Sequence, residues 1–209
     1  MCGIAGIFNV TGTAVPMSVL RAMTDIVAHR GPDGEGTWAH EGVGFGHRRL
    51  AIVDLSPGGH QPMRSSDGAL VITYNGELYN WRELRRELER KGAHFRTQSD
   101  TEVILEAYRA WGPKCVERFN GMFAFALWDG RSKKLFLARD RYGIKPLYYR
   151  WDGNILLFGS EIKSILQHPA VSVRVDPNSL NEYFTFQNVL SDRTLFDGIK
   201  LLPRATMLT

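Results

Sequence analysis

The sequence has few of the features that mark membrane, secreted or disulfide-rich proteins. No run approaches the roughly 18–20 consecutive apolar residues of a membrane-spanning helix, and Met1 is not followed by the basic and apolar segments of a secretory signal. The chain has only 2 cysteines in 209 residues, too few for a disulfide framework, and this fits a reducing compartment. We therefore expect a soluble, cytoplasmic protein that does not act on a membrane.

Support for metal or nucleic-acid binding is equally sparse. The 6 histidines show no metal-ligand spacing, and the net charge is only +4. The densest basic run, Arg82 to Lys91, is interleaved with glutamates, which indicates a solvated helix face and no nucleic-acid partner. Gly42, Gly44 and Gly46 suggest a phosphate loop, but the spacing and the following helix of such a loop are missing. No metal and no cofactor are expected for this chain.

The composition, 44% hydrophobic and 23% charged, is typical of a single globular domain. We expect one domain over residues 1–209, with a tail from about residue 170 that is either an edge strand or the start of a linker. Helices fall between blocks of strands rather than after every strand, which favours antiparallel sheets covered by helices. Strands are predicted at 4–8, 43–53, 70–74, 94–96, 122–128, 135–139, 148–151 and 155–158, and helices at 16–27, 80–91, 100–111 and 161–166.

Two of these helices carry candidate N-terminal caps. Asn80 followed by Glu83 has the spacing of a capping box. Asp100 stands before the apolar stripe of the next helix, where an aspartate side chain can accept from the first backbone N–H groups.

Cys2 stands out because two reactive groups can meet on it. If Met1 is removed, Cys2 carries a thiol and the free α-amine, and an N-terminal amine can serve as the base for an adjacent nucleophile. The ordinary pKa of a cysteine thiol, about 8.5, is close to that of an α-amine, about 7.7–8.0. With these values, only a small shift of either pKa is needed to form the thiolate.

Further residues could complete a site around Cys2, and each has a structural alternative. Arg49 could grip a carboxylate with its fork, or be an ordinary surface arginine. Asn75 and Gly76 could supply a side-chain amide and a backbone N–H to an oxyanion, or form a type I′ turn.

The remaining candidates are open in the same way. Asp100 could pair with a substrate ammonium group or simply cap its helix. Arg30, Gly31 and Glu77 could line a pocket, or meet water as polar residues of loops and strand ends do.

Beyond these single residues, longer stretches occur together in order: MCGIAGIF, HRGPDG, HRRLAIVD, YNGELYN, SDTEVIL, GMFAFALWD and RDRYGIKPLYY. Together they resemble the glutaminase domain of glutamine-dependent asparagine synthetases, which are class II amidotransferases of the N-terminal-nucleophile hydrolase group. The resemblance runs from Met1 to about Ile165. It implies an α+β fold, a four-layer αββα sandwich of two antiparallel sheets.

The resemblance also implies roles. Cys2 matches the nucleophile that attacks the glutamine side-chain amide, forming a thioester that is hydrolysed to glutamate while ammonia leaves. Asn75 and Gly76 match the oxyanion hole, Arg49 the residue that holds the α-carboxylate, and Asp100 the partner of the α-amine. Glu77, Arg30 and Gly31 are expected to contribute to substrate binding near these groups.

One expected part has no match in the chain. Asparagine synthetases carry a second domain with a Ser-Gly-Gly-x-Asp-Ser pyrophosphate loop, and nothing in this sequence corresponds to it. ATP and magnesium are therefore expected only in that synthetase domain, the implied partner and ammonia acceptor. The alternatives are the glutaminase half of another class II amidotransferase and a non-catalytic module of the same fold. A homodimer is compatible with the resemblance, although the sequence gives no oligomeric state.

Overall fold

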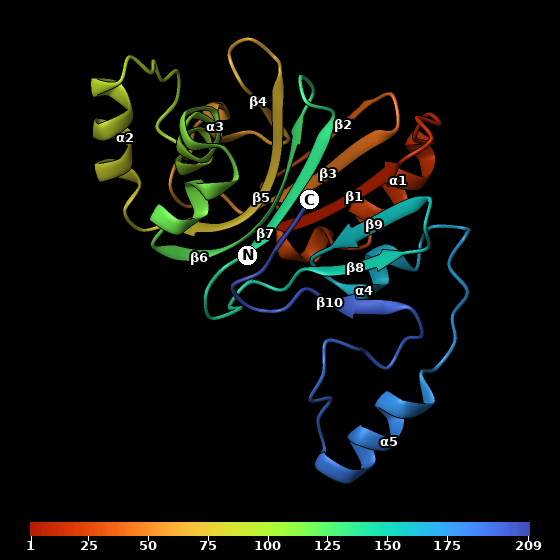
Figure 1. Ribbon diagram of the computed structural model, residues 1–209. Helices are drawn as coiled ribbons and strands as arrows, with labels where there is room; N and C mark the ends of the chain where they lie inside the picture. Colours follow the sequence, from red (N-terminus) through yellow and green to blue (C-terminus); the bar gives the residue numbers. More distant parts are fainter.

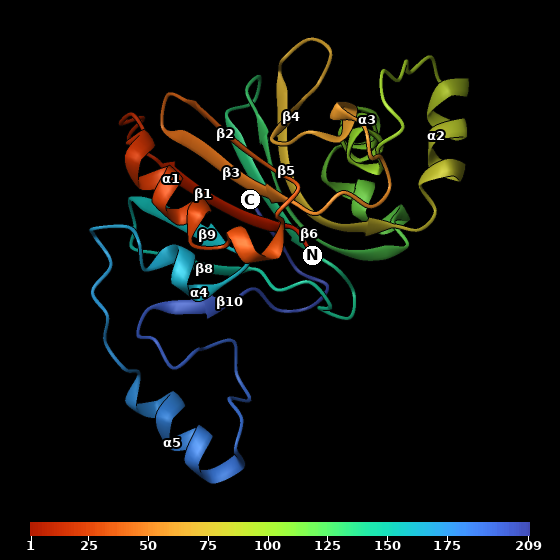
Figure 2. The ribbon, with the colours of Figure 1, turned by 180° about the vertical axis from the view of Figure 1, so that it is seen from behind.

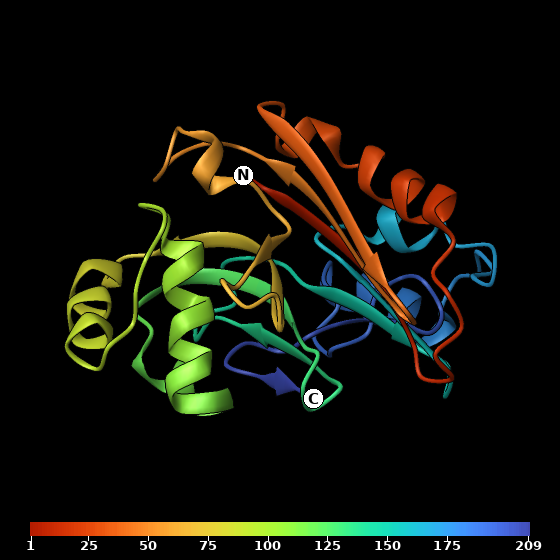
Figure 3. The same ribbon diagram turned by 90° about the horizontal axis from the view of Figure 1, so that it is seen from above.

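Alternating apolar side chains build two antiparallel sheets, and helices cover the outer face of each (Figure 3). The computed structural model describes residues 1–209. The order of layers is helices, sheet, sheet, helices, so the predicted α+β, four-layer αββα sandwich is confirmed.

Sheet A has six strands and sheet B has five. In spatial order, sheet A consists of β10 (Ile199–Leu201), β8 (Tyr148–Trp151), β9 (Ile155–Gly159), β1 (Gly3–Asn9), β3 (Val43–Arg49) and β2 (Gly34–His40). Sheet B consists of β11 (Met207–Leu208), β7 (Lys134–Arg139), β6 (Gly121–Asp129), β5 (Leu70–Leu78) and β4 (Met63–Arg64). The helices are α1 (Met17–Asp25), α2 (Trp81–Arg90), α3 (Asp100–Trp111), α4 (Ile162–Ile165) and α5 (Pro177–Phe186), with 3-10 turns at Ala28–Arg30, Pro57–Gly59 and Gly112–Arg118.

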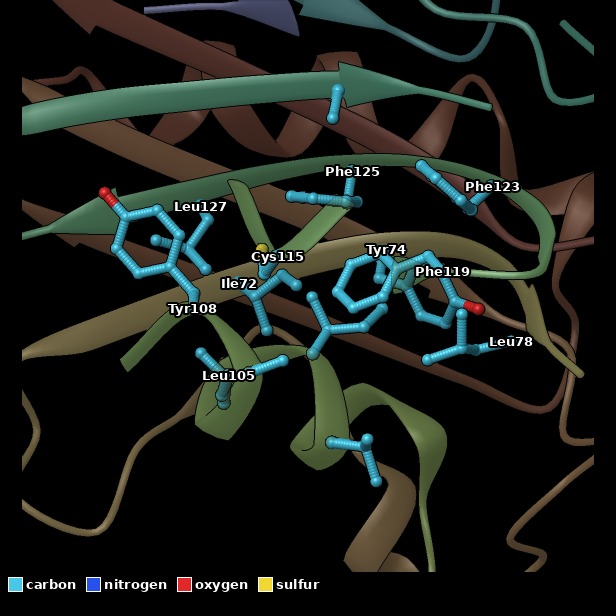
Figure 4. Packing of buried hydrophobic residues seen from close by; sticks show 14 of the residues in the cluster. Ile72, Tyr74, Leu78, Leu105, Tyr108, Cys115, Phe119, Phe123, Phe125 and Leu127 are labelled. Atoms are coloured by element: carbon cyan, nitrogen blue, oxygen red, sulfur yellow. The ribbon is translucent and has the colours of Figure 1, made fainter. Parts of the chain in front are cut away.

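Three apolar clusters fill the spaces between the four layers. One joins sheet B to α2 and α3 and includes Ile72, Phe125 and Leu105 (Figure 4). A second lies between the sheets and includes Ile4 of β1 and Val71 of β5. The third joins sheet A to α1 and α4. Figures 1 and 2 show that α5 alone projects away from these layers.

Strand alternation decides which side chains face the space between the sheets. Successive residues of a strand point to opposite faces, so Cys2 shares a face with Ile4, and Asn75 shares a face with Val71. Two hydrogen bonds cross the same space: His47 Nε2 donates to Tyr74 O at 3.1 Å, and Thr73 Oγ1 donates to Gly46 O at 3.2 Å. The end of β3 therefore faces the middle of β5 across this layer, and so does the start of β1, because Ile4 pairs with His47.

Most predicted strands and helices are present, but the predicted ends of two strands are wrong. Strand β3 ends at Arg49 and does not continue to residue 53, because Leu50 N donates to the Cys2 sulfur and Ala51 N donates to Asp33 Oδ2 instead of to a neighbouring strand. Strand β5 does not end before Asn75-Gly76 in a turn; it continues to Leu78, and Asn75 and Gly76 pair with Ala124 and Phe123 of β6. Partners on the neighbouring strand outweigh the local turn preference of Asn-Gly.

Both predicted helix caps are also corrected. Asn80 occupies the N-cap position of α2 without a side-chain cap bond, because its side chain bonds instead to Arg118 O and Asn120 N. The N-cap of α3 is Ser99, whose hydroxyl accepts from Thr101 N at 3.2 Å, while Asp100 is the first helical residue.

Elsewhere the structure adds or removes elements. The predicted strand at 94–96 is irregular chain, and β2 was not predicted. The tail from residue 170, expected as an edge strand or linker, contains helix α5 and returns to the body as β10 and β11. No helix of the chain has both the length and the apolar character needed to cross a membrane.

The aromatic core under α3 should carry much of the stability. Phe125 is fully buried and packs against Phe123 and Phe136, with ring centroids 5.8 and 5.7 Å away. Phe125→Ala should lower the free energy of unfolding by about 3–5 kcal/mol, because it removes apolar contact and leaves a cavity. Urea denaturation measures this loss. Tyr142→Ala is the control, since Tyr142 is 80% exposed; equal losses in both variants would contradict the packing.

Candidate active site

Cys2 lies just before β1, with its thiol against the chain that follows β3. Leu50 N donates to the Cys2 sulfur at 3.4 Å, and the thiol donates to Leu50 O at 3.5 Å. Burial raises the pKa of the Cys2 thiol, and the hydrogen bond from Leu50 only partly offsets this effect. With Met1 attached, the thiol of Cys2 is therefore protonated near neutral pH and needs a base, while the match of thiol and amine pKa values in a chain that begins at Cys2 stays a prediction.

The side-chain amide of Asn75 lies in the same cavity as Cys2. Asn75 is 1% exposed, and its Nδ2 atom is buried without a hydrogen-bond partner. Leaving a buried donor unpaired costs about 1–3 kcal/mol, and such a group in a fold calls for an explanation. A donor aimed at an oxyanion that forms only during a reaction would explain it.

Gly76 offers a second donor at the same place. Tyr74 N donates to Gln61 Oε1 at 2.6 Å and Leu78 N donates to Asp100 Oδ2 at 3.0 Å, so these N–H groups point away from β6. Because N–H directions alternate along a strand, the Gly76 N–H also points away from β6. It lies between the N–H groups of Tyr74 and Leu78. A Cβ on Gly76 would clash with the β6 backbone, both with Met122 O and with Phe123 Cα at 2.8 Å. The residue must therefore be glycine for the strands to approach.

Cys2, Asn75 and Gly76 line one cavity of about 140 Å³. Sites for drug-sized ligands are roughly 300–1,000 Å³, so this cavity suits a molecule the size of one amino acid. Its lining residues are Met1, Cys2, Arg49, Leu50, Ile52, Val53, Asp54, Gly59, Gln61, Tyr74, Asn75, Gly76, Glu77, Ser99, Asp100, Thr101, Met122 and Lys145.

Asp100 reaches this cavity from the helix layer. Its carboxylate accepts from the Tyr74 hydroxyl at 2.9 Å and from Leu78 N at 3.0 Å. Burial raises the pKa of Asp100, against the lowering effect of these hydrogen bonds. A cation placed beside it would favour the charged form, which fits a site for an ammonium group.

Arg49 enters from the end of β3. Its fork donates to backbone carbonyls of the following loop, to Ser56 O at 2.9 Å and to Asp54 O. A Cβ on Gly59 would collide with this guanidinium, so the glycine makes room for it. A substrate carboxylate would compete with the loop carbonyls for hydrogen bonds from the Arg49 guanidinium.

The three other predicted site residues lie in different places. Glu77 lines the cavity. Arg30 lies outside the lining and donates through Nε to Cys2 O at 2.9 Å. Gly31 also lies outside the lining, packed so closely on Arg48 that a side chain would collide with its backbone. Arg30 is thus placed to support Cys2, while direct substrate contact by Arg30 and Gly31 stays a prediction.

Residues that the sequence did not single out also contribute. Gln61 bridges β5 and α3, since its amide donates to Thr101 Oγ1 at 3.2 Å as well as accepting from Tyr74 N. Lys145 lines the cavity beside Met1, with Nζ 3.1 Å from the Met1 sulfur. Burial lowers the pKa of Lys145, opposed mainly by the charge of Glu77. Of Gln61 and Lys145, only Lys145 lies in one of the stretches that carry the family resemblance, RDRYGIKPLYY.

The comparisons with known proteins agree with this geometry. The profile of the glutamine amidotransferase domain family matches residues 1–209. Glutamine-hydrolyzing asparagine synthetase 3 of Bacillus subtilis (strain 168) is 45% identical over 213 residues, covering 100% of this chain and 34% of that protein. A putative glutamine-hydrolyzing asparagine synthetase 2 of Methanocaldococcus jannaschii is 38% identical over 229 residues, covering 100% of this chain and 44% of that protein.

Among solved structures, glutamine phosphoribosylpyrophosphate amidotransferase from B. subtilis superimposes with a TM-score of 0.66 at 23% identity, over 78% of this chain and 43% of that chain. This likeness shows that the two chains share a fold. The chain belongs to the glutamine amidotransferase domain family. It spans about a third of the length of its B. subtilis asparagine synthetase relatives.

The first prediction from this geometry concerns the unpaired amide. Asn75→Ala should lower kcat for glutamine hydrolysis by roughly 10²–10³, the usual cost of one oxyanion donor. KM should change less, because the contact strengthens as the tetrahedral oxyanion forms. Steady-state kinetics measure both. Normal kcat with a raised KM would instead make Asn75 a substrate clamp.

The second prediction concerns recognition of the amino-acid backbone. Arg49→Lys keeps the charge but loses the planar fork, so KM for glutamine should rise roughly tenfold or more, from about 1.5–3 kcal/mol per charged hydrogen bond. Kinetics with glutamine, and with a primary amide lacking the α-carboxylate and α-amine, test this. Equal cleavage of both substrates by the unmodified chain would contradict the assignment of Arg49 and Asp100.

Proposed function

We propose that this chain hydrolyses the side-chain amide of glutamine to glutamate and ammonia through a thioester on Cys2. The observation that carries the proposal is the cavity in which the Cys2 thiol and the unpartnered Asn75 amide lie together, with Asp100 at its wall. Nucleophile, oxyanion donor and ammonium partner are the groups that this reaction needs.

The reaction begins when a base removes the Cys2 proton and the sulfur attacks the amide carbon. The developing oxyanion accepts from Asn75 Nδ2 and the Gly76 N–H. As the C–N bond breaks, the base returns the proton to the leaving nitrogen, and ammonia departs. Water then attacks the thioester and the C–S bond breaks. Glutamate is released and the Cys2 thiol is regenerated.

The α-amine of Cys2 is the proposed base. The raised pKa of the thiol makes a base necessary, and a cysteine freed of Met1 carries an amine on the same residue. Arg49 and Asp100 hold the α-carboxylate and α-ammonium groups of glutamine, which restricts the substrate to the free amino acid.

The ammonia is proposed to serve asparagine synthesis from aspartate in an ATP-dependent synthetase domain that is not present in this chain. The relatives at 45% and 41% identity are glutamine-hydrolyzing asparagine synthetases, which favours this acceptor over those of other class II amidotransferases. ATP and magnesium would bind in the synthetase domain. A cytoplasmic location fits the two free cysteines, and a homodimer stays a prediction.

The assignment of the nucleophile is tested with the two cysteines. Cys2→Ala should reduce glutamine hydrolysis to near background with the fold intact, as circular dichroism would show. Cys115 is buried under α3, and burial raises its pKa to about 12, so Cys115→Ala should leave activity largely unchanged. Equal loss in both variants would contradict the assignment of Cys2, whereas an unmodified chain without activity would favour a non-catalytic module.

The assignment of the base is tested by controlling the first residue. Cysteine is small enough to permit removal of Met1, and the Met1 side chain borders the cavity. A protease-released chain that begins at Cys2 should be active, whereas one that retains Met1 should be much slower, with intact mass verifying each form. Full activity with Met1 attached would show that the α-amine is not the base.

A further inference from the structure

The backbone of Cys2 is held from outside the cavity by one side chain. Pairing of β1 with β3 begins at Gly3, and pairing with β9 begins at Ala5, so Cys2 precedes the ladder. The Cys2 carbonyl instead accepts from Arg30 Nε at 2.9 Å. The position of the nucleophile therefore depends on where the Arg30 guanidinium is fixed.

Glu161 fixes that guanidinium. Its Oε1 atom accepts from Arg30 Nη1 at 3.0 Å and from His29 Nε2 at 2.9 Å, while Oε2 lies 3.1 Å from Lys163 Nζ. Burial raises the pKa of Glu161, but the hydrogen bonds from Arg30, Lys163 and His29 outweigh it, so this pKa lies below its ordinary value. The carboxylate is therefore charged near neutral pH.

The charge matters because Arg30 is largely withdrawn from water. The Arg30 side chain is 9% exposed, and its Nη2 atom is buried without a hydrogen-bond partner. Removing one partner of a buried ion pair leaves an uncompensated charge, which is strongly unfavourable. Without Glu161, the free energy of the guanidinium would fall if it turned toward solvent. The Cys2 carbonyl would then lose its hydrogen-bond donor.

The residue before Glu161 anchors the same strand directly. Ser160 Oγ accepts from Ile4 N at 3.0 Å, and Ser160 N donates to Ile4 O at 2.9 Å. The pair Ser160-Glu161, at the end of β9, thus holds Ile4 by direct bonds and Cys2 through Arg30.

We propose that Glu161 is a positioning residue for glutamine hydrolysis, because its carboxylate fixes Arg30, and Arg30 holds the carbonyl of the nucleophilic Cys2. This inference rests on the proposed function and extends it to a residue outside the cavity. Glu161 acts on the placement of the sulfur and not on substrate binding, since neither it nor Arg30 belongs to the cavity lining.

The expected signature is a loss of kcat at nearly constant KM. A nucleophile misplaced by about 1 Å can cost roughly 10²-fold in rate, so Glu161→Ala should lower kcat by about tenfold to a hundredfold while KM changes less than about twofold. Glu161→Gln should lose less, because its amide oxygen still accepts from Arg30. Lys163→Ala is the control, since Lys163 contacts the same carboxylate without touching Arg30 or Cys2, and it should stay near the unmodified rate.

A double-mutant cycle separates positioning through Arg30 from a general loss of structure. If Glu161 acts through Arg30, Glu161→Ala should cause little further loss of kcat in an Arg30→Ala background. A fully additive loss, a raised KM with normal kcat, or an equal loss in Lys163→Ala would overturn the inference. If Glu161→Ala fails to fold, the same cycle with Glu161→Gln gives the answer.

A second readout distinguishes failure of this inference from failure of the proposed function. An electrophilic diazo ketone analogue of glutamine should alkylate Cys2, located by mass spectrometry, and Glu161→Ala should slow this labelling. If the unmodified chain neither hydrolyses glutamine nor is labelled at Cys2, the proposed function fails and the inference with it. If the unmodified chain does both and Glu161→Ala matches it in both, only the inference is overturned.

Discussion

The apolar layer between sheets A and B sets the geometry of the catalytic end, because Cys2 precedes a strand of one sheet and Asn75 belongs to a strand of the other. Ile4 and Val71 pack in this layer, and strand alternation then points Cys2 and Asn75 into the same space. The proposed oxyanion donor and the proposed nucleophile are thus placed by packing that needs no substrate. Such preorganisation is what makes electrostatic stabilisation effective in catalysis.

Burial at this end of the sandwich shifts the pKa values of ionisable groups, and the proposed mechanism depends on these shifts. Burial raises the pKa values of Cys2 and Asp100 and lowers that of Lys145. An α-amine on Cys2 would supply a base for the thiol, and a substrate ammonium group would favour the charged form of Asp100. Glutamine and a processed N-terminus would each satisfy a group that the protein alone leaves in an unfavourable state.

The sequence predicts the strand-rich core from local patterns, and its contiguous motifs single out Cys2, Asn75 and Asp100, which the structure brings to one cavity. It does not predict that Asn75 lies inside a strand, since pairing with β6 outweighs the turn preference of Asn-Gly. It also misses Glu161, whose role depends on contacts with residues 131 and 132 positions away. Such long-range ion pairs leave no periodic signal in a sequence.

The central claim, a covalent intermediate on Cys2, is tested most directly by trapping it. The purified chain beginning at Cys2 is mixed with glutamine, quenched in acid within the first turnovers, digested, and its N-terminal peptide weighed by mass spectrometry. The account predicts that this peptide gains one glutamyl group through its sulfur, that the adduct is absent in Cys2→Ala, and that it accumulates less in Asn75→Ala. Ammonia release with no adduct on Cys2, or an adduct elsewhere in the chain, would contradict it.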